Sequence, residues 1–121
     1  MVYGDTWNYR EEAGYEPGVD LIGFSVEALD GSIGKIDQAT SETSMNYVVI
    51  DTGPWIFGQK VLLPAGIITS VDYDNESVAV NRTMEEIKNA PPFDESTYRE
   101  SSYHDELGSY YGPSGIGYRD W

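Results

Sequence analysis

Few side chains in this sequence have the chemistry of a catalytic or metal-binding group, and they are scattered along the chain. His104 is the single histidine and stands beside Asp105 and Glu106. A catalytic triad or a metal site needs a second group held in a fixed frame, such as a serine nucleophile or another metal ligand. The residues around His104 supply no such group, so we expect a solvated and mobile imidazole.

Residues 72–76 offer carboxylate and amide oxygens of the kind that surround a cation. A calcium-binding loop of the common type also needs glycine at its sixth position and an acidic residue at its twelfth. Counted from Asp72, these positions hold Ser77 and Thr83. The pattern fails, and a polar turn between two strands is the better interpretation.

Acid–base catalysis and phosphate binding find no support either. Asp37 and Asp51 lie on expected strands, but nothing in the sequence brings both carboxylates into one cleft, as acid–base catalysis requires. No Lys-Ser/Thr pair or helix start follows Gly53, Gly58 or Gly66, as it would in a phosphate-binding loop. We therefore expect a non-enzymatic protein with no catalytic residue, no cofactor and no metal site.

Trp55, Ile56 and Phe57 are the remaining candidates for a functional site, within a loop at 52–58. In one interpretation, their side chains fold over the end of the core. In the other, they form an exposed apolar patch for self-association or for a partner, because clustered aromatic residues are favoured at interfaces. The two interpretations overlap, and these three residues are our candidate interface.

The elements that would position this loop are strands. Residues 47–50 and 61–63 are short apolar runs on either side of it, and such runs between turn residues are typical of buried strands. Asp30-Gly31 is typical of a tight turn. Gly34 lies just after it and predicts a bulge or a close backbone approach. Further strands are expected at 21–26, 33–38, 67–71 and 77–81.

A short helix is expected after the last strand. Thr83 and Glu86 have the spacing of a capping box, in which each side chain satisfies a backbone amide at the start of the helix. The helix is expected over 84–90, because Pro91 restricts the residue before it.

The two ends of the chain differ from the middle in composition. Residues 1–18 and 95–121 contain eight of the ten tyrosines but few large aliphatic residues. Such segments cannot build a core of their own, so we expect a flexible N-terminal arm and a flexible, tyrosine-rich acidic tail around one domain at 19–94. Alternatively, these rings dock on the domain or on a partner subunit, since tyrosine provides a large contact area.

Composition excludes several classes of protein. The 121 residues suffice for one domain, and a formal net charge of −14 disfavours direct binding to nucleic acid or to anionic membranes. The chain has no cysteine, no apolar run long enough to span a bilayer and no signal-peptide pattern. We expect a soluble, cytoplasmic protein without a transmembrane segment.

The core resembles the PRC-barrel family in four motifs. These are Leu21-Ile22-Gly23, Asp30-Gly31-x-x-Gly34-Lys35-Ile36, Tyr47-Val48-Val49-Ile50-Asp51 with Thr52-Gly53, and Lys60-Val61-Leu62-Leu63-Pro64-Ala65-Gly66. The resemblance implies an all-β fold, a small barrel of about six strands. Together with the helix and the tails expected from the residues themselves, this gives a small barrel with a short C-terminal helix and flexible tails. Such barrels occur in the photosynthetic reaction-centre H subunit, in the ribosome maturation factor RimM and as free-standing proteins, and this chain is most similar to the free-standing group.

The resemblance also implies an adaptor role, in some members linked to stress. We therefore expect a non-enzymatic protein–protein interaction module that binds a protein partner of unknown identity. The aromatic residues of the 52–58 loop and the small size of the core further predict a homodimer. One alternative is a ribosome-assembly adaptor similar to RimM, with its acidic surface bound to a basic ribosomal protein. A second alternative is a small-ligand binder, which would need a pocket lined by convergent polar groups.

Overall fold

The structure, a computed structural model, describes residues 6–16, 19–40, 46–53 and 59–111. Its centre is one six-stranded mixed sheet with the strand order β4-β3-β2-β1-β6-β5, and only the β1–β6 pair is parallel. The strands are β1 (Ser25–Ala28), β2 (Gly31–Ala39), β3 (Tyr47–Asp51), β4 (Lys60–Pro64), β5 (Ile68–Asp72) and β6 (Ser77–Val80). The expected sheet-rich fold is confirmed, and the sheet is open in its hydrogen bonding, with β4 and β5 at its ends.

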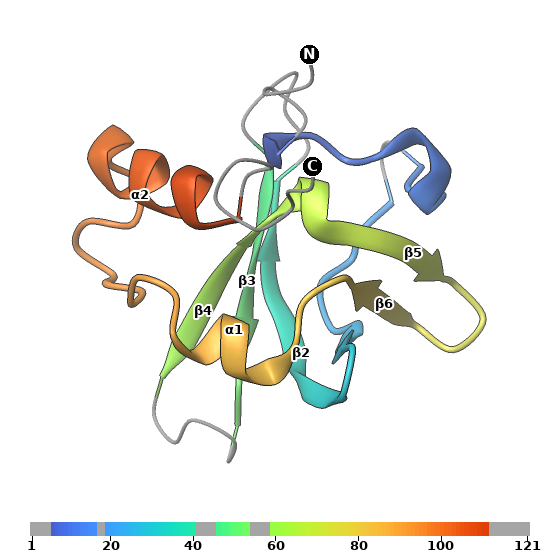
Figure 1. Ribbon diagram of the computed structural model, residues 1–121. Helices are drawn as coiled ribbons and strands as arrows, with labels where there is room; N and C mark the ends of the chain where they lie inside the picture. The colour runs from blue at the N-terminus through green and yellow to red at the C-terminus, as the bar shows by residue number, and fades with distance from the viewer. Residues whose placement is uncertain (1–5, 17–18, 41–45, 54–58, 112–121) are drawn as a thin grey trace, which may run out of the picture.

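Sharp curvature comes from irregularities in the central strands. Figure 1 shows β2, β3 and β4 running together, while β5 and β6 run across them. Gly34 has a φ of 143°, and a Cβ atom there would lie 2.1 Å from the carbonyl oxygen of Asp51. The β1–β2 register shifts next to this residue. The close backbone approach that the sequence predicts at Gly34 is therefore confirmed.

The middle of β3 is buried on both faces of the sheet. Val48, Val49 and Ile50 are all fully buried, although successive side chains of a strand point to opposite faces. One face therefore lines an inner core, and the other is covered by chain outside the sheet. The inner core includes Val26, Ile33, Ile36, Leu63, Ile68 and Val78.

Helix α1 (Met84–Lys88) follows β6 and confirms the predicted capping box. Glu86 N–H donates to Thr83 Oγ1 at 3.1 Å, and Thr83 N–H donates to Glu86 Oε1 at 2.8 Å. The short helix turns Ile87 inward, where only 1% of the residue is exposed.

The described parts of both chain ends pack against the sheet, which is the arrangement of the alternative interpretation and not the expected flexible one. Helix α2 (Ser101–Tyr111) lies beside β4 and buries Tyr103, Leu107 and Tyr111 (Figure 1). These three positions are four residues apart and share one helix face. At the other end, the 3₁₀ helix η2 (Glu11–Ala13) packs near β5, which a second 3₁₀ helix, η3 (Ala65–Ile67), joins to β4. The alternative in which the tyrosines dock on the domain is the correct one for these residues.

His104 is part of this docked layer and is not solvated. Only 9% of the residue is exposed, and its Nε2 lies 2.8 Å from the carbonyl oxygen of Tyr98. Its ring centroid lies 5.4 Å from that of Trp7 and 5.8 Å from that of Tyr47. The imidazole therefore fills a packed aromatic cluster between α2, the N-terminal segment and β3.

We expect the docked tyrosines to make stability depend on pH in the alkaline range. Burial, with a smaller contribution from Glu106, raises the pKa of Tyr103 from 10.0 to about 12. The unfolded chain loses this proton near pH 10.0, whereas the folded chain holds it to about pH 12. The stabilisation is thus complete below pH 10 and is lost as the pH rises to about 12. Urea denaturation across this range should show a smaller loss of stability in Tyr103→Phe; equal losses in the two proteins would contradict the assignment.

Candidate binding surface at the edge of β4

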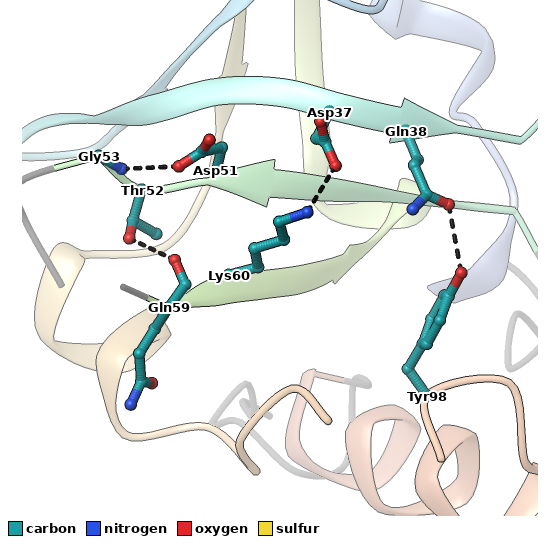
Figure 2. Close-up of polar contacts among 8 residues, drawn as sticks. All are labelled: Asp37, Gln38, Asp51, Thr52, Gly53, Gln59, Lys60 and Tyr98. Carbon is teal, nitrogen blue, oxygen red and sulfur yellow. Dashed lines mark hydrogen bonds and ion pairs between the residues drawn. The ribbon is translucent and has the colours of Figure 1, made fainter. Parts of the chain in front are cut away.

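The loop between β3 and β4 has a closed base. Thr52 is buried, and its Oγ1 donates to the carbonyl oxygen of Gln59 at 2.7 Å. Asp51 Oδ1 accepts from the N–H of Gly53 at 3.0 Å, and Gly53 has a φ of 58° (Figure 2). Asp51 thus caps a turn. These bonds hold the two ends of the loop together at the end of the β3–β4 hairpin.

The candidate interface of Trp55, Ile56 and Phe57 lies outside the described residues and stays a prediction. The structure places only the flanks of this loop, Gly53 and Gln59, and both are exposed. The loop therefore starts and ends at the surface.

Lys60 begins β4 and forms an ion pair across the sheet. At the shift in the β2–β3 pairing, Asp37 has no partner residue on β3. Its carboxylate reaches over β3 to Lys60, with Oδ2 2.9 Å from Nζ (Figure 2). The hydrogen bond to Asp37 raises the pKa of Lys60, so its amine stays protonated and is not a nucleophile. Both side chains are partly exposed, which limits the contribution of such a pair to about 1 kcal/mol or less. Asp37 thus pairs with Lys60, whereas Asp51 bonds to the turn at Gly53.

The outer edge of β4 is open along two residues. Thr40 N–H donates to the carbonyl oxygen of Tyr47, so the backbone groups of Tyr47 point toward β2. Backbone direction alternates along a strand, so Val49 and Asp51 also point toward β2 and away from β4. Leu62 and Lys60 lie opposite these two residues, and their own backbone groups therefore point away from β3. Within residues 6–16, 19–40, 46–53 and 59–111, no backbone hydrogen bond from outside the sheet reaches either residue.

The opposite end of the sheet is covered. Arg10 Nε donates to the carbonyl oxygen of Gly66 at 2.6 Å, and Tyr73 Oη donates to that of Gly14 at 2.9 Å. The N-terminal segment thus packs beside β5, whereas the outward backbone groups of Lys60 and Leu62 have no backbone partner among the described residues, although only 2% of Leu62 is exposed.

A pocket of about 250 Å³ opens beside this edge, and we call it the β4 pocket. It is lined by residues 59–62, 87–88 and 90–93 together with Tyr111. Most of these residues are aliphatic, proline or phenylalanine. Among the described residues of the lining, Lys60 and Lys88 are the charged ones.

Tyr111 belongs to this lining, but its hydroxyl is buried. Only 2% of the residue is exposed, and its Oη has no hydrogen-bond partner among the described residues. Arg82 anchors it from behind, because its Nη2 donates to the carbonyl oxygen of Tyr111 at 2.6 Å and its Cζ lies 5.7 Å from the ring centroid. Burial is the main cause that raises the pKa of Tyr111 above its ordinary value, so the hydroxyl keeps its proton.

Sequence reasoning missed both Lys88 and Tyr111 as parts of a site. The spacing of Tyr103, Leu107 and Tyr111 was the one available signal, because residues four apart share a helix face. It does not indicate which strand that face covers.

The acidic turn between β5 and β6 is explained by its internal bonds. Asp72 accepts from both the backbone and the side-chain nitrogen of Asn75, and these bonds lower the pKa of Asp72. The positive φ of this turn falls on Glu76, at 52°. Across the described ranges, no group of three or more His, Cys, Asp or Glu residues is placed to hold a metal ion.

No protein-family model matches this chain, and no curated protein matches it closely. The resemblance to PRC-barrel proteins therefore stays a prediction from sequence motifs. In the part of the chain that the structure describes, no helix has the length and apolar character needed to cross a membrane.

Proposed function

We propose that this chain is a non-enzymatic protein-interaction module of the PRC-barrel type that forms a homodimer through the open edge of β4 and the adjacent loop at 54–58. The observation that carries the proposal is the outward direction of the backbone groups of Lys60 and Leu62. A strand edge whose backbone groups lack partners is a template for pairing with another chain, and Lys60, which is partly exposed, is the accessible end of this edge. The same edge of a second copy can pair with it around a two-fold axis.

The way the ends of the sheet are joined supports a barrel-like shape. Six strands laid flat would separate β4 from β5 by about 24 Å, at about 4.8 Å between neighbours. Only the three residues of η3 join these strands, and a chain of that length spans at most about 15 Å. The sheet must therefore curve back toward itself, as the PRC-barrel resemblance implies.

The loop is expected to supply most of the binding free energy. Pro64 lacks an N–H group, so the open edge offers only the donors of Lys60 and Leu62. Each backbone hydrogen bond contributes about 1 kcal/mol net, whereas a micromolar dimer needs about 8 kcal/mol. The apolar side chains of Trp55, Ile56 and Phe57, next to this edge in the sequence, are the available source of the remainder.

Sedimentation velocity at micromolar concentration tests the proposal. We expect a dimer for the wild type, a monomer for Trp55→Ala/Phe57→Ala, and a weakened dimer for Lys60→Pro, which removes one outward N–H. Lys60→Gln is the matched control, because it loses the same ion pair with Asp37 but keeps the backbone donor. A monomeric wild type, or equal masses for all variants, would reject this interface.

A further inference from the structure

We propose that the N-terminal segment at 6–16 is a strap that holds α2 on the sheet, with Trp7 as the residue that joins the two. We call this segment the N-terminal strap. The inference goes beyond the proposed protein interface and does not depend on it, because it concerns contacts within one copy of the chain. Three observations carry it: the position of Trp7, the glycine of α2 that faces Trp7, and the small number of buried residues in the strap.

Trp7 contacts both α2 and β3. The centroid of its ring system lies 5.4 Å from that of His104 on α2 and 6.5 Å from that of Tyr47 on β3. Its carbonyl oxygen accepts from the N–H of Asn46 at 2.5 Å, directly before β3 begins. The indole therefore lies between the helix and the sheet, while the backbone of Trp7 is bonded to the sheet.

Gly108 lies within α2 and makes room for the indole. A Cβ atom at this position would lie 3.1 Å from Nε1 of Trp7, whereas packed atoms normally lie about 3.5–4.0 Å apart. Glycine is less favourable than alanine inside a helix. The helix thus carries an unfavourable residue where the strap packs on it, as expected if contact with Trp7 stabilises α2 more than the glycine weakens it.

Neither segment is expected to keep its place alone. Within residues 6–16, Ala13 is the one fully buried residue, and an isolated helix of the 11 residues of α2 is marginal in water. The strap has a separate anchor at its other end, where Tyr73 Oη donates to the carbonyl oxygen of Gly14 at 2.9 Å. The strap is therefore fixed to the sheet away from α2, and Trp7 extends this hold to the helix.

The test is amide hydrogen exchange of the ¹⁵N-labelled full chain, measured at the amides of α2. Trp7→Ala should speed their exchange about tenfold or more, because truncation of a packed aromatic side chain removes its contacts. Tyr73→Phe is the matched control, because it keeps the ring but loses the hydrogen bonds to Gly14 and Glu16. It should speed exchange at residues 14–16 and change that of α2 by less than about twofold, as expected for distant sites.

A double-mutant cycle with Gly108→Ala tests the contact itself. Alanine favours helix, so Gly108→Ala should slow exchange of α2 about fivefold when Trp7→Ala is also present. In the wild type the new Cβ meets the indole, and the slowing should be about twofold or less. The comparison holds whether α2 opens alone or with the sheet, because one substitution is measured in two backgrounds.

Equal slowing by Gly108→Ala in the two backgrounds would overturn the proposal, because Trp7 would then not restrict this position. Equal exchange of α2 in Trp7→Ala and Tyr73→Phe would overturn it as well. The amide spectrum reports whether each variant is folded. Trp7→Phe, which lacks the Nε1 atom that faces Gly108, provides the second background if Trp7→Ala is unfolded.

Discussion

Replacement of Gly34 by alanine is expected to lower the free energy of unfolding by about 4 kcal/mol. The φ of 143° at this position is one that residues with a side chain rarely adopt, and such strain costs about 1–3 kcal/mol. The new Cβ would also lie 2.1 Å from the Asp51 oxygen and 2.9 Å from Thr52 Cα, and overlap of this kind costs about 1–3 kcal/mol more. Urea denaturation measures the change.

Gly31→Ala is the matched control for this substitution. Its Cβ would lie 2.6 Å from Met84 Sδ, near the end of a flexible and partly exposed side chain that can move aside. We expect a loss below about 1 kcal/mol there. The atoms that meet Gly34 are backbone atoms at the base of the 52–58 loop and cannot move without displacing it. Equal losses in the two variants would show that the contact between Gly34 and Asp51 is not tight.

The sequence could predict those elements whose signals are local. Gly34 was expected to mark a close approach because glycine within a strand pattern has few other uses. The Thr83–Glu86 spacing predicts the start of α1, since both partners of a capping box lie within one turn. The apolar runs at 47–50 and 61–63 likewise correspond to β3 and β4.

Features that depend on distant segments could not be predicted in this way. Helix α2 was expected to be a flexible tail, because the segment has few aliphatic residues and its tyrosines have no definite preference between surface and core. Their burial depends on the apolar face of β3 at Tyr47 and Val49, which the other strands leave open for α2 to cover. The parallel β1–β6 pair joins strands about 50 residues apart, as in Val26 with Val78, and no local pattern specifies such a pairing.

The β4 pocket is another feature that could not be predicted, because it is built from segments far apart in the sequence. Its lining comes from the start of β4, the end of α1, the proline-containing segment after it and the last residue of α2. In the sequence, Lys88 is an ordinary exposed residue at a helix end. It shares a pocket lining with Tyr111 and the edge of β4 only because the fold brings these distant segments together.

Leu107→Ala is expected to destabilise the docked state of α2 by about 3 kcal/mol. Leu107 is fully buried at the centre of the helix, and truncation of such a leucine removes buried surface and leaves a cavity, at a cost of about 2–5 kcal/mol. Alanine favours helix, so the loss reflects packing and not helix propensity. Glu106→Ala, at the neighbouring exposed position of α2, is the control and should change stability by less than about 0.5 kcal/mol.

Chymotrypsin cleavage and urea denaturation of Leu107→Ala together test whether α2 unfolds with the sheet or separately from it. Tyr103, Leu107 and Tyr111 are buried chymotrypsin sites in the wild type. If α2 undocks alone, Leu107→Ala should be cut within the helix while the sheet keeps its unfolding midpoint. We expect the midpoint to fall together with the onset of cleavage, because Tyr110 Oη bonds to the Glu86 carbonyl at 2.6 Å and Arg82 to that of Tyr111, which ties α2 to α1 and to the end of β6. Rapid cleavage with an unchanged midpoint would instead show that these bonds do not couple the helix to the sheet.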